Sequence, residues 1–285
     1  MSDFLSRHRL PVEFRRVAEQ HYWPLAKRLP QMRDGRRQLL LGVNGAQGTG
    51  KSTLADFLRL ATESMFEWNV AVLSIDDFYF TLAERKALAD EVHPLLRTRG
   101  VPGTHDTDML ARYLERLQRL AASERIALPR FDKSVDDRAE ESRWPVVNGP
   151  VDLVILEGWC VGTVAQSAAE LQRPVNALER DEDPDGVWRR YVNDQLRAKY
   201  EPIFAQLDAL IFIGAPNFKA ILRWRLEQEE KLAAASPSSS SGLMSKQQIV
   251  RFIQFYERLT RFNLAMLPDS ADFVFRLDDS HAIIP

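Results

Sequence analysis

Short apolar runs alternate along the chain with longer segments in which apolar residues recur at helical spacing. Residues 36–45, RRQLLLGVNG, predict a buried strand that ends in a loop, and residues 70–75, VAVLSI, predict a second buried strand. Between them, Leu54, Leu58 and Ala61 lie on one face of a helix. Strand, helix and strand within about 40 residues form a βαβ unit, and such units predict a parallel sheet with helices on its faces.

The alternation continues to the end of the chain. Further strands are predicted over residues 125–130, 151–158, 208–215 and 271–277, and further helices over residues 110–117, 187–207, 217–234 and 246–267. A helix that Pro24 bends or interrupts extends from residue 11 to about residue 29. Because no long linker divides the chain, we expect one domain over residues 1–285, with residues 1–36 as a helical extension.

The composition is that of a globular protein. Hydrophobic residues make up 45% of the 285 residues and charged residues 27%, which allows a sizeable core. A formal net charge of -2 gives no reason to expect a nucleic-acid partner. The sequence contains neither an apolar run of membrane-spanning length nor the apolar region of a secretory signal. Since Cys160 is the only cysteine, no intrachain disulfide is expected. We expect a cytoplasmic protein without a membrane partner, and a monomer is favoured.

One motif indicates specific chemistry. The segment GAQGTGKS follows the first predicted strand, precedes a helix and matches G-x-x-x-x-G-K-[ST] at every required position. Its glycines allow a tight turn in which main-chain N–H groups point at one phosphate, at the positive end of a helix. Lys51 is expected to reach the β- and γ-phosphates of ATP, and the Ser52 hydroxyl is expected to hold Mg²⁺. The nucleotide-binding candidates are Gly45, Ala46, Gln47, Gly48, Thr49, Gly50, Lys51, Ser52 and Thr53.

Acidic residues at strand ends favour a kinase over other nucleotide-binding proteins. The N-K-x-D sequence with which GTPases usually read guanine is absent. Glu157 ends a predicted strand and is a candidate to hold Mg²⁺ through water; alternatively, it only marks where the strand meets solvent. Asp76 and Asp77 follow the strand over residues 70–75, at the edge where ligands bind in open α/β sheets.

A carboxylate beside a phosphate loop repels the phosphates, so we expect it to have a task. Asp76 is assigned to accept the proton of the attacking hydroxyl or to hold Mg²⁺, with Asp77 as the alternate base. The predicted metal ligands are Ser52, Asp76 and Glu157. The alternative is that the aspartate pair caps the next helix.

Two loops rich in basic residues favour an anionic acceptor. One contains Arg97, Arg99 and His105, and the other contains Arg130 and Lys133. A carboxylate on the acceptor requires cations or well-aimed donors, and these loops hold more positive charge than a neutral nucleoside or vitamin requires. The alternative is that the side chains are solvated surface charges. The acceptor-binding candidates in and near the loops are Asp77, Tyr79, Arg97, Arg99, His105, Arg130 and Lys133.

The phosphate loop, SIDDFYFT and RTRGVPGTHD together resemble the phosphoribulokinase/uridine kinase-like group of P-loop kinases. Within that group the chain is most similar to the plant and fungal D-glycerate 3-kinase family, through LPRFDKS, VILEGW, WRLEQE and MSKQQI. The resemblance implies a P-loop NTPase-type α/β fold, a parallel sheet flanked by helices with a helical lid over about residues 217–246. It also implies a Mg²⁺-dependent phosphotransferase that moves the γ-phosphoryl group of ATP to a hydroxyl of D-glycerate, giving 3-phosphoglycerate and ADP.

The same resemblance implies roles for individual residues. Asp76 lies near the acceptor hydroxyl, Glu157 lies near the metal, and RGVPGTHD supplies acceptor contacts. Arg225 of WRLEQE lies in the lid and is a catalytic candidate, as is Lys51. Arg223 faces another side of the same helix. The Ser-rich stretch 236–242 departs from the family pattern and is either a lid hinge or an inert loop.

Two other functions are compatible with these residues. The first is a related kinase for pantothenate, a nucleoside or a sugar phosphate. The second is a nucleotide-dependent regulatory ATPase, which would hydrolyse ATP slowly without an acceptor and respond to a macromolecule.

Overall fold

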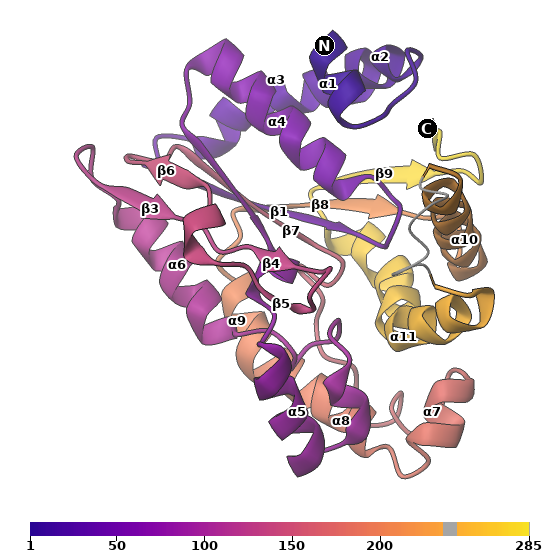
Figure 1. The fold of residues 1–285 in the computed structure, drawn as a ribbon. Helices are drawn as coiled ribbons and strands as arrows, with labels where there is room; N and C mark the ends of the chain where they lie inside the picture. The colour runs from indigo at the N-terminus through magenta and orange to yellow at the C-terminus, as the bar shows by residue number, and fades with distance from the viewer. Residues whose placement is uncertain (236–243, 285) are drawn as a thin grey trace.

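The computed structural model describes residues 1–235 and 244–284, and in this part of the chain the centre is a six-stranded sheet (Figure 1). The order across the sheet is β10-β9-β8-β1-β7-β2. Its strands are β1 (Leu39–Gly45), β2 (Val70–Ser74), β7 (Leu153–Gly158), β8 (Ala209–Gly214), β9 (Phe273–Leu277) and β10 (Ile283–Ile284). All neighbouring strands are parallel except β9 and β10. The predicted α/β class is confirmed.

Helices cover both faces of the sheet, and each face has its own hydrophobic core. The α-helices are α1 (Ser2–Arg7), α2 (Phe14–Val17), α3 (Trp23–Arg33), α4 (Lys51–Phe66), α5 (Leu82–Glu91), α6 (Thr107–Arg119), α7 (Ala177–Glu182), α8 (Val187–Gln195), α9 (Glu201–Phe204), α10 (Phe218–Ala235) and α11 (Lys246–Ser270). Figure 1 shows α4 with the amino-terminal helices on one face and α6, α8 and α9 on the other. Helices α10 and α11 stand near the ends toward which the arrows of β8 and β9 point. Among the described helices, none combines the length and the apolar character that crossing a membrane requires.

The central strands are covered on both sides, which explains why their sequences are continuous apolar runs. β1 lies between β7 and β8, and Leu41 in its middle is completely buried opposite Ile155 and Ala209. Because these strands are parallel, the residues at their carboxyl ends meet at one edge of the sheet. The phosphate loop after β1, Glu157 on β7 and the aspartate pair after β2 therefore belong to the same edge.

The predicted amino-terminal helix is present but consists of three pieces. α2 continues into a π-helical turn, Ala18–Tyr22, and then into α3. Pro24 lies in the first turn of α3, where its missing N–H is tolerated. Tyr22 and Trp23 approach Phe57 of α4 edge-on, with ring centroids 5.4 and 5.1 Å away. The extension thus packs on the helix that follows the phosphate loop.

Two predicted elements are present, with details that the sequence pattern did not show. The strand predicted over residues 125–130 is β3 (Arg125–Ala127), and it pairs antiparallel with β6 (Val146–Asn148) in a separate two-stranded ribbon. The helix predicted over residues 187–207 runs from 187 to 204 without a break, with a π-helical segment, Leu196–Tyr200, between α8 and α9. A helical apolar stripe does not distinguish an i+4 from an i+5 hydrogen bond, so the sequence pattern did not reveal the π-helical segment.

Several short elements between β2 and β7 were not predicted. They are α5, the hairpin of β4 (Phe131–Asp132) and β5 (Asp137–Arg138), and the 3-10 helices Ile75–Phe78, Pro94–Arg97 and Glu141–Arg143. α5 has no strong apolar stripe, but it begins with a capping box in which Thr81 and Glu84 bond reciprocally. That T-x-x-E pattern was a readable signal for its start.

Candidate active site

The phosphate loop connects the end of β1 to the start of α4. Gly48 and Gly50 have φ angles of 82° and 88°, in the left-handed region that glycine adopts without steric cost. A Cβ atom on Gly45 would lie 2.4 Å from the Thr49 hydroxyl oxygen, so that position also excludes a side chain. The loop therefore has the tight main-chain turn that phosphate binding requires, and Lys51 begins the helix behind it.

Glu157 and Ser52 lie together beside the phosphate loop. Glu157 lies opposite Val43 in the register of β7 and β1, which brings its carboxylate beside the phosphate loop. The Ser52 hydroxyl donates a hydrogen bond to Glu157 Oε1 at 2.9 Å. Glu157 Oε2 is buried and has no hydrogen-bond partner among the described residues. A hydroxyl next to a buried carboxylate oxygen with free lone pairs fits Mg²⁺, which prefers oxygen ligands and retains several waters. The strand-exit alternative for Glu157 is disfavoured by this burial.

Asp76 lies in the 3-10 helix that follows β2. Its carboxylate accepts hydrogen bonds from the Tyr79 hydroxyl at 2.9 Å and from Lys133 Nζ at 2.6 Å. Burial by itself would raise the pKa of this carboxyl, but the charges of Lys133 and Lys51 outweigh it and hold the pKa at about 2. Asp76 is therefore ionised near neutral pH and able to accept a hydrogen bond from a substrate hydroxyl.

Asp77 points to a different group of residues. It accepts hydrogen bonds from Arg130 Nη1 and from the main-chain N–H of Phe131, both at 3.1 Å. Burial, with help from the nearby charges of Asp76 and Glu157, raises its pKa to about 6. Neither aspartate caps the next helix, because Thr81 occupies that position. The two neighbouring carboxylates thus have separate surroundings: one faces Lys51, and the other anchors the β4–β5 hairpin.

The raised pKa of Asp77 predicts a pH-dependent stability. Its pKa in the folded protein lies above the ordinary value of 3.8, so folding favours the protonated form. Below about pH 4 this preference therefore contributes roughly 2 to 3 kcal/mol to the free energy of unfolding. The contribution is lost as the pH rises through about 6. The free energies of unfolding of wild type and Asp77→Asn, measured in urea, should therefore diverge between about pH 4 and pH 7, with the wild type losing relative stability.

The same exchange at the exposed Asp90 of α5 is the matched control for this measurement. A constant difference in unfolding free energy between wild type and Asp77→Asn across that pH range would contradict the argument from burial.

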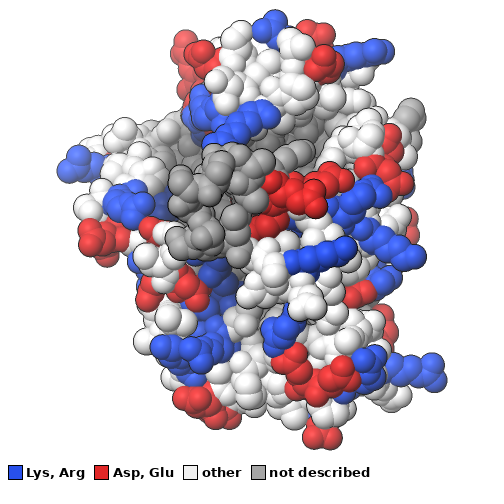
Figure 2. Space-filling model, turned by 45° about the vertical axis from the view of Figure 1, so that its right-hand side comes forward, with Lys and Arg blue, Asp and Glu red and all other residues white. Residues whose placement is uncertain are grey.

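A cavity of about 360 Å³ opens between the phosphate loop, the β4–β5 hairpin, α10 and α11. Its lining residues are Gln47, Gly48, Lys51, Asp76, Tyr79, Arg99, Lys133, Trp159, Arg225, Gln228, Met244, Phe252 and Tyr256. Four of these side chains carry positive charge and one carries negative charge. In Figure 2, the described acidic and basic side chains are interspersed over the visible face and form no single large patch of one sign. The excess of positive charge in the cavity lining is what would attract an anion.

The structure separates the predicted acceptor-binding residues into two groups. Tyr79, Arg99 and Lys133 line the cavity, whereas Asp77, Arg97, His105 and Arg130 do not belong to its lining. Arg97 is exposed, and its carbonyl accepts a hydrogen bond from Arg85.

His105 lies behind Tyr79, with its ring stacked on the Tyr79 ring at 4.4 Å. Its Nδ1 is 2.7 Å from the Tyr200 hydroxyl, which in turn accepts the N–H of Gly103. Burial lowers the pKa of His105 to about 4, although the charge of Asp76 opposes the shift. The imidazole is therefore neutral near neutral pH, and it supports Tyr79 rather than presenting a cation to the acceptor.

An aromatic wall of the cavity was missed at the sequence level. Trp159, Phe252 and Tyr256 form it, and the Trp159 and Tyr256 rings meet edge-to-face at 4.9 Å. Trp159 directly follows Glu157 and Gly158, so its place after β7 was an available signal. For α11, the broad apolar face indicated a buried helix but did not show which residues reach the cavity.

The lid candidates lie where α10 passes over the phosphate loop. Arg225 lines the cavity, and its guanidinium is 2.7 Å from the Glu229 carboxylate on the same helix. Arg223 points elsewhere, to Asp279 at 2.7 Å. Trp224 lies against the phosphate loop: a Cβ atom on Gly48 would be in ordinary van der Waals contact with the Trp224 Cβ, at 3.5 Å. The Ser-rich stretch 236–242, considered as a lid hinge or an inert loop, lies outside the described residues.

Comparison with known proteins yields relatives that are kinases. No protein-family model matches the chain. An uncharacterized kinase of Schizosaccharomyces pombe is 35% identical over 228 residues, which cover 77% of this chain and 79% of that protein. The chloroplastic D-glycerate 3-kinase of Arabidopsis thaliana is 31% identical over 229 residues, which cover 76% of this chain but 46% of that protein.

A solved structure is similar over nearly the whole fold. The D-glycerate 3-kinase of Cryptococcus neoformans superposes with a TM-score of 0.76 at 25% sequence identity. The superposition covers 94% of this chain and 98% of that one.

Proposed function

This chain belongs to the family of P-loop kinases that includes D-glycerate 3-kinase, and we propose that its acceptor is D-glycerate. Family membership makes it an ATP-dependent phosphotransferase with an alcohol group of a small molecule as acceptor. The proposed reaction forms a bond between the γ-phosphorus of ATP and the 3-hydroxyl oxygen of D-glycerate. It breaks the bond to the β-phosphate and yields 3-phosphoglycerate and ADP, and the hydroxyl proton is released.

The observation that carries the proposal is the composition of the 360 Å³ cavity. Lys51 of the phosphate loop and the carboxylate of Asp76 face the same space as Arg99 and Lys133, which come from two other loops. An acceptor with both a hydroxyl and a carboxylate satisfies this arrangement, because the carboxylate pairs with the cations while the hydroxyl meets Asp76. Arg99 and Lys133 also pair with Asp136 and Asp76, so an acceptor carboxylate would share these cations, whereas a neutral acceptor would make no use of the positive charge of the lining.

The residues then take distinct parts in the transfer. Asp76, already ionised, accepts a hydrogen bond from the attacking hydroxyl and receives its proton. Lys51 and the main-chain N–H groups of the phosphate loop hold the phosphates of ATP and stabilise the charge on the transferred group. Arg225 approaches the same group from α10. When bound, Mg²⁺ would neutralise phosphate charge, and Ser52 and Glu157, which lie within hydrogen-bond distance of each other, would hold it.

An acceptor panel tests the substrate. ADP release measured by a coupled assay should rise at least about tenfold above the acceptor-free rate with D-glycerate, because without an acceptor only slow hydrolysis remains. Glycerol keeps the hydroxyl groups and lacks the carboxylate, so it should give little stimulation. D-lactate keeps the carboxylate and lacks the 3-hydroxyl, so it should give none.

The panel also separates the competing functions. If pantothenate, a nucleoside or a sugar phosphate stimulates ADP release and D-glycerate does not, the proposed acceptor is wrong. The protein would still be a kinase, with the stimulating compound as its acceptor. ADP release that no small molecule stimulates but a macromolecule does would favour a regulatory ATPase.

A further inference from the structure

One arginine side chain outside the cavity is completely enclosed by the protein. Arg85 lies in the second turn of α5 and has 0% of its surface exposed. It makes no contact with the cavity, and nothing in the proposed transfer uses it. Burying a guanidinium costs free energy unless its N–H groups have hydrogen-bond acceptors. Moving one of these acceptors would leave a buried N–H group unpaired, so the guanidinium opposes displacement of its partners.

Those partners come from three separate segments. The Arg85 Nε donates to the Phe80 carbonyl at 3.1 Å, and Nη1 donates to the Arg97 carbonyl at 2.8 Å. Nη2 donates to the Asp136 carbonyl at 2.8 Å and lies 2.9 Å from the Asp136 carboxylate. A planar fork of donors makes these contacts at once, and a single ammonium group does not offer that geometry.

Each of the three segments carries one residue that lines the acceptor side of the cavity. Tyr79 precedes Phe80, Arg99 follows Arg97 by two positions, and Lys133 precedes Asp136 in the β4–β5 hairpin. The three side chains are far apart in the sequence, and α5 is the element to which all three segments are bound through one guanidinium.

Asp136 strengthens this connection. Its φ of 56° is a left-handed conformation that a residue other than glycine seldom adopts. Its carboxylate pairs with Arg85 and also with the guanidinium of Arg99. The Phe131 ring at the start of the hairpin lies under both guanidinium groups, with centroid distances of 5.9 and 5.6 Å, and meets the Tyr79 ring edge-on at 5.3 Å.

We propose that Arg85, acting through Asp136, is the positioning residue that sets the acceptor side of the active site. It holds Arg99, Lys133 and Tyr79 at the spacing that an anionic hydroxy acid requires, and leaves the nucleotide side untouched. The prediction of an acceptor rests on the proposed function, whereas the connection among the segments rests on the geometry alone.

The variant Arg85→Lys keeps the positive charge and loses the planar set of N–H donors. Its kcat/KM for D-glycerate should fall at least about tenfold, with most of the change in the KM of the acceptor, since small displacements of aligned groups are costly. The KM for ATP should stay within about twofold of wild type, because Lys51 and the phosphate loop make no contact with Arg85.

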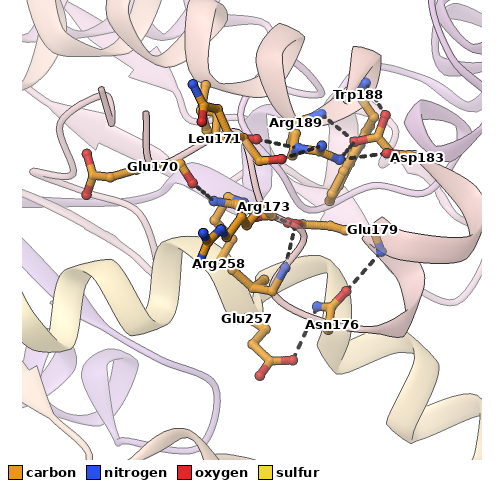
Figure 3. Close-up of polar contacts among 12 residues, drawn as sticks. Glu170, Leu171, Arg173, Asn176, Glu179, Asp183, Trp188, Arg189, Glu257 and Arg258 are labelled. Carbon is orange, nitrogen blue, oxygen red and sulfur yellow. Dashed lines mark hydrogen bonds and ion pairs between the residues drawn. The ribbon is translucent and has the colours of Figure 1, made fainter. Parts of the chain in front are cut away.

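Arg189→Lys is the matched control. Arg189 is also buried and donates to the Leu171, Asp183 and Gln172 carbonyls and to the Asp183 carboxylate, as Figure 3 shows for Leu171 and Asp183. None of these partners lines the acceptor cavity. Arg189→Lys should lose stability to a similar extent and keep both KM values.

A second readout needs no acceptor. Amide hydrogen exchange in residues 97–104 and 131–138 should accelerate in Arg85→Lys relative to Arg189→Lys, while exchange in α4 should not change. If wild type does not phosphorylate D-glycerate, the substrate proposal fails, and this exchange comparison still decides the role of Arg85.

The outcomes are distinct. An acceptor kcat/KM in Arg85→Lys within about twofold of the Arg189→Lys value, or unchanged exchange in the two segments, overturns the proposal. If Arg85→Lys does not fold, Asp136→Asn tests the same proposal, because Asp136 is partly exposed. This variant should raise the acceptor KM several-fold. An acceptor KM in Asp136→Asn within about twofold of wild type overturns it as well.

Discussion

Replacing Lys51 by alanine is expected to lower kcat for phosphoryl transfer by about 10³-fold or more. The Lys51 side chain lines the cavity beside the phosphate loop, and in the proposed mechanism it is the cation that contacts the transferred phosphoryl group. The loss of one positive charge aimed at the transferred group removes stabilisation of the charge that develops in the transition state. The measurement is the coupled ADP-release rate at saturating ATP and acceptor.

The fold should not change in this variant, because Lys51 is partly exposed at the first position of α4 and helix formation does not depend on it. The melting temperature should therefore match that of Lys27→Ala, a control at an exposed lysine on α3. Turnover by Lys51→Ala at the wild-type rate would remove the basis for placing the triphosphate in the loop.

Asp76→Asn is expected to lower kcat by about 10²-fold or more while ATP binding stays near its wild-type affinity. The amide keeps the size of the side chain and still accepts from the Tyr79 hydroxyl, whereas it loses the negative charge that pairs with Lys133 and, in the proposed mechanism, receives the proton. ATP affinity is measured by titration calorimetry, and kcat by the coupled assay.

Asp77→Asn is the decisive comparison, because the two aspartates are adjacent in the sequence. The Asp77 carboxylate bonds to the β4–β5 hairpin and does not line the cavity, so its variant should retain far more activity than Asp76→Asn. A larger loss of kcat in Asp77→Asn would transfer the role of base to Asp77.

Much of the nucleotide side of the site was predictable from local sequence. The phosphate loop joins a strand and a helix that are consecutive in the chain, so the pattern from Gly45 to Ser52 specifies the local shape without long-range information. Glu157 was predictable for a related reason. Parallel strands end at the same edge of a sheet, and a carboxylate at the end of a buried strand must lie at that edge.

The sequence by itself thus determined the fold class, the phosphate loop and the edge of the sheet at which the chemistry takes place, because these follow from short periodic or contiguous patterns. Only the tertiary structure decided which basic residues line the cavity. Arg97 and Arg99 are two positions apart in a loop without periodicity, and their directions depend on packing against Asp136 and α5. The aromatic wall combines Trp159 after β7 with Phe252 and Tyr256 of α11, and Arg85 also connects residues distant in the chain, so only the tertiary packing brings these residues together.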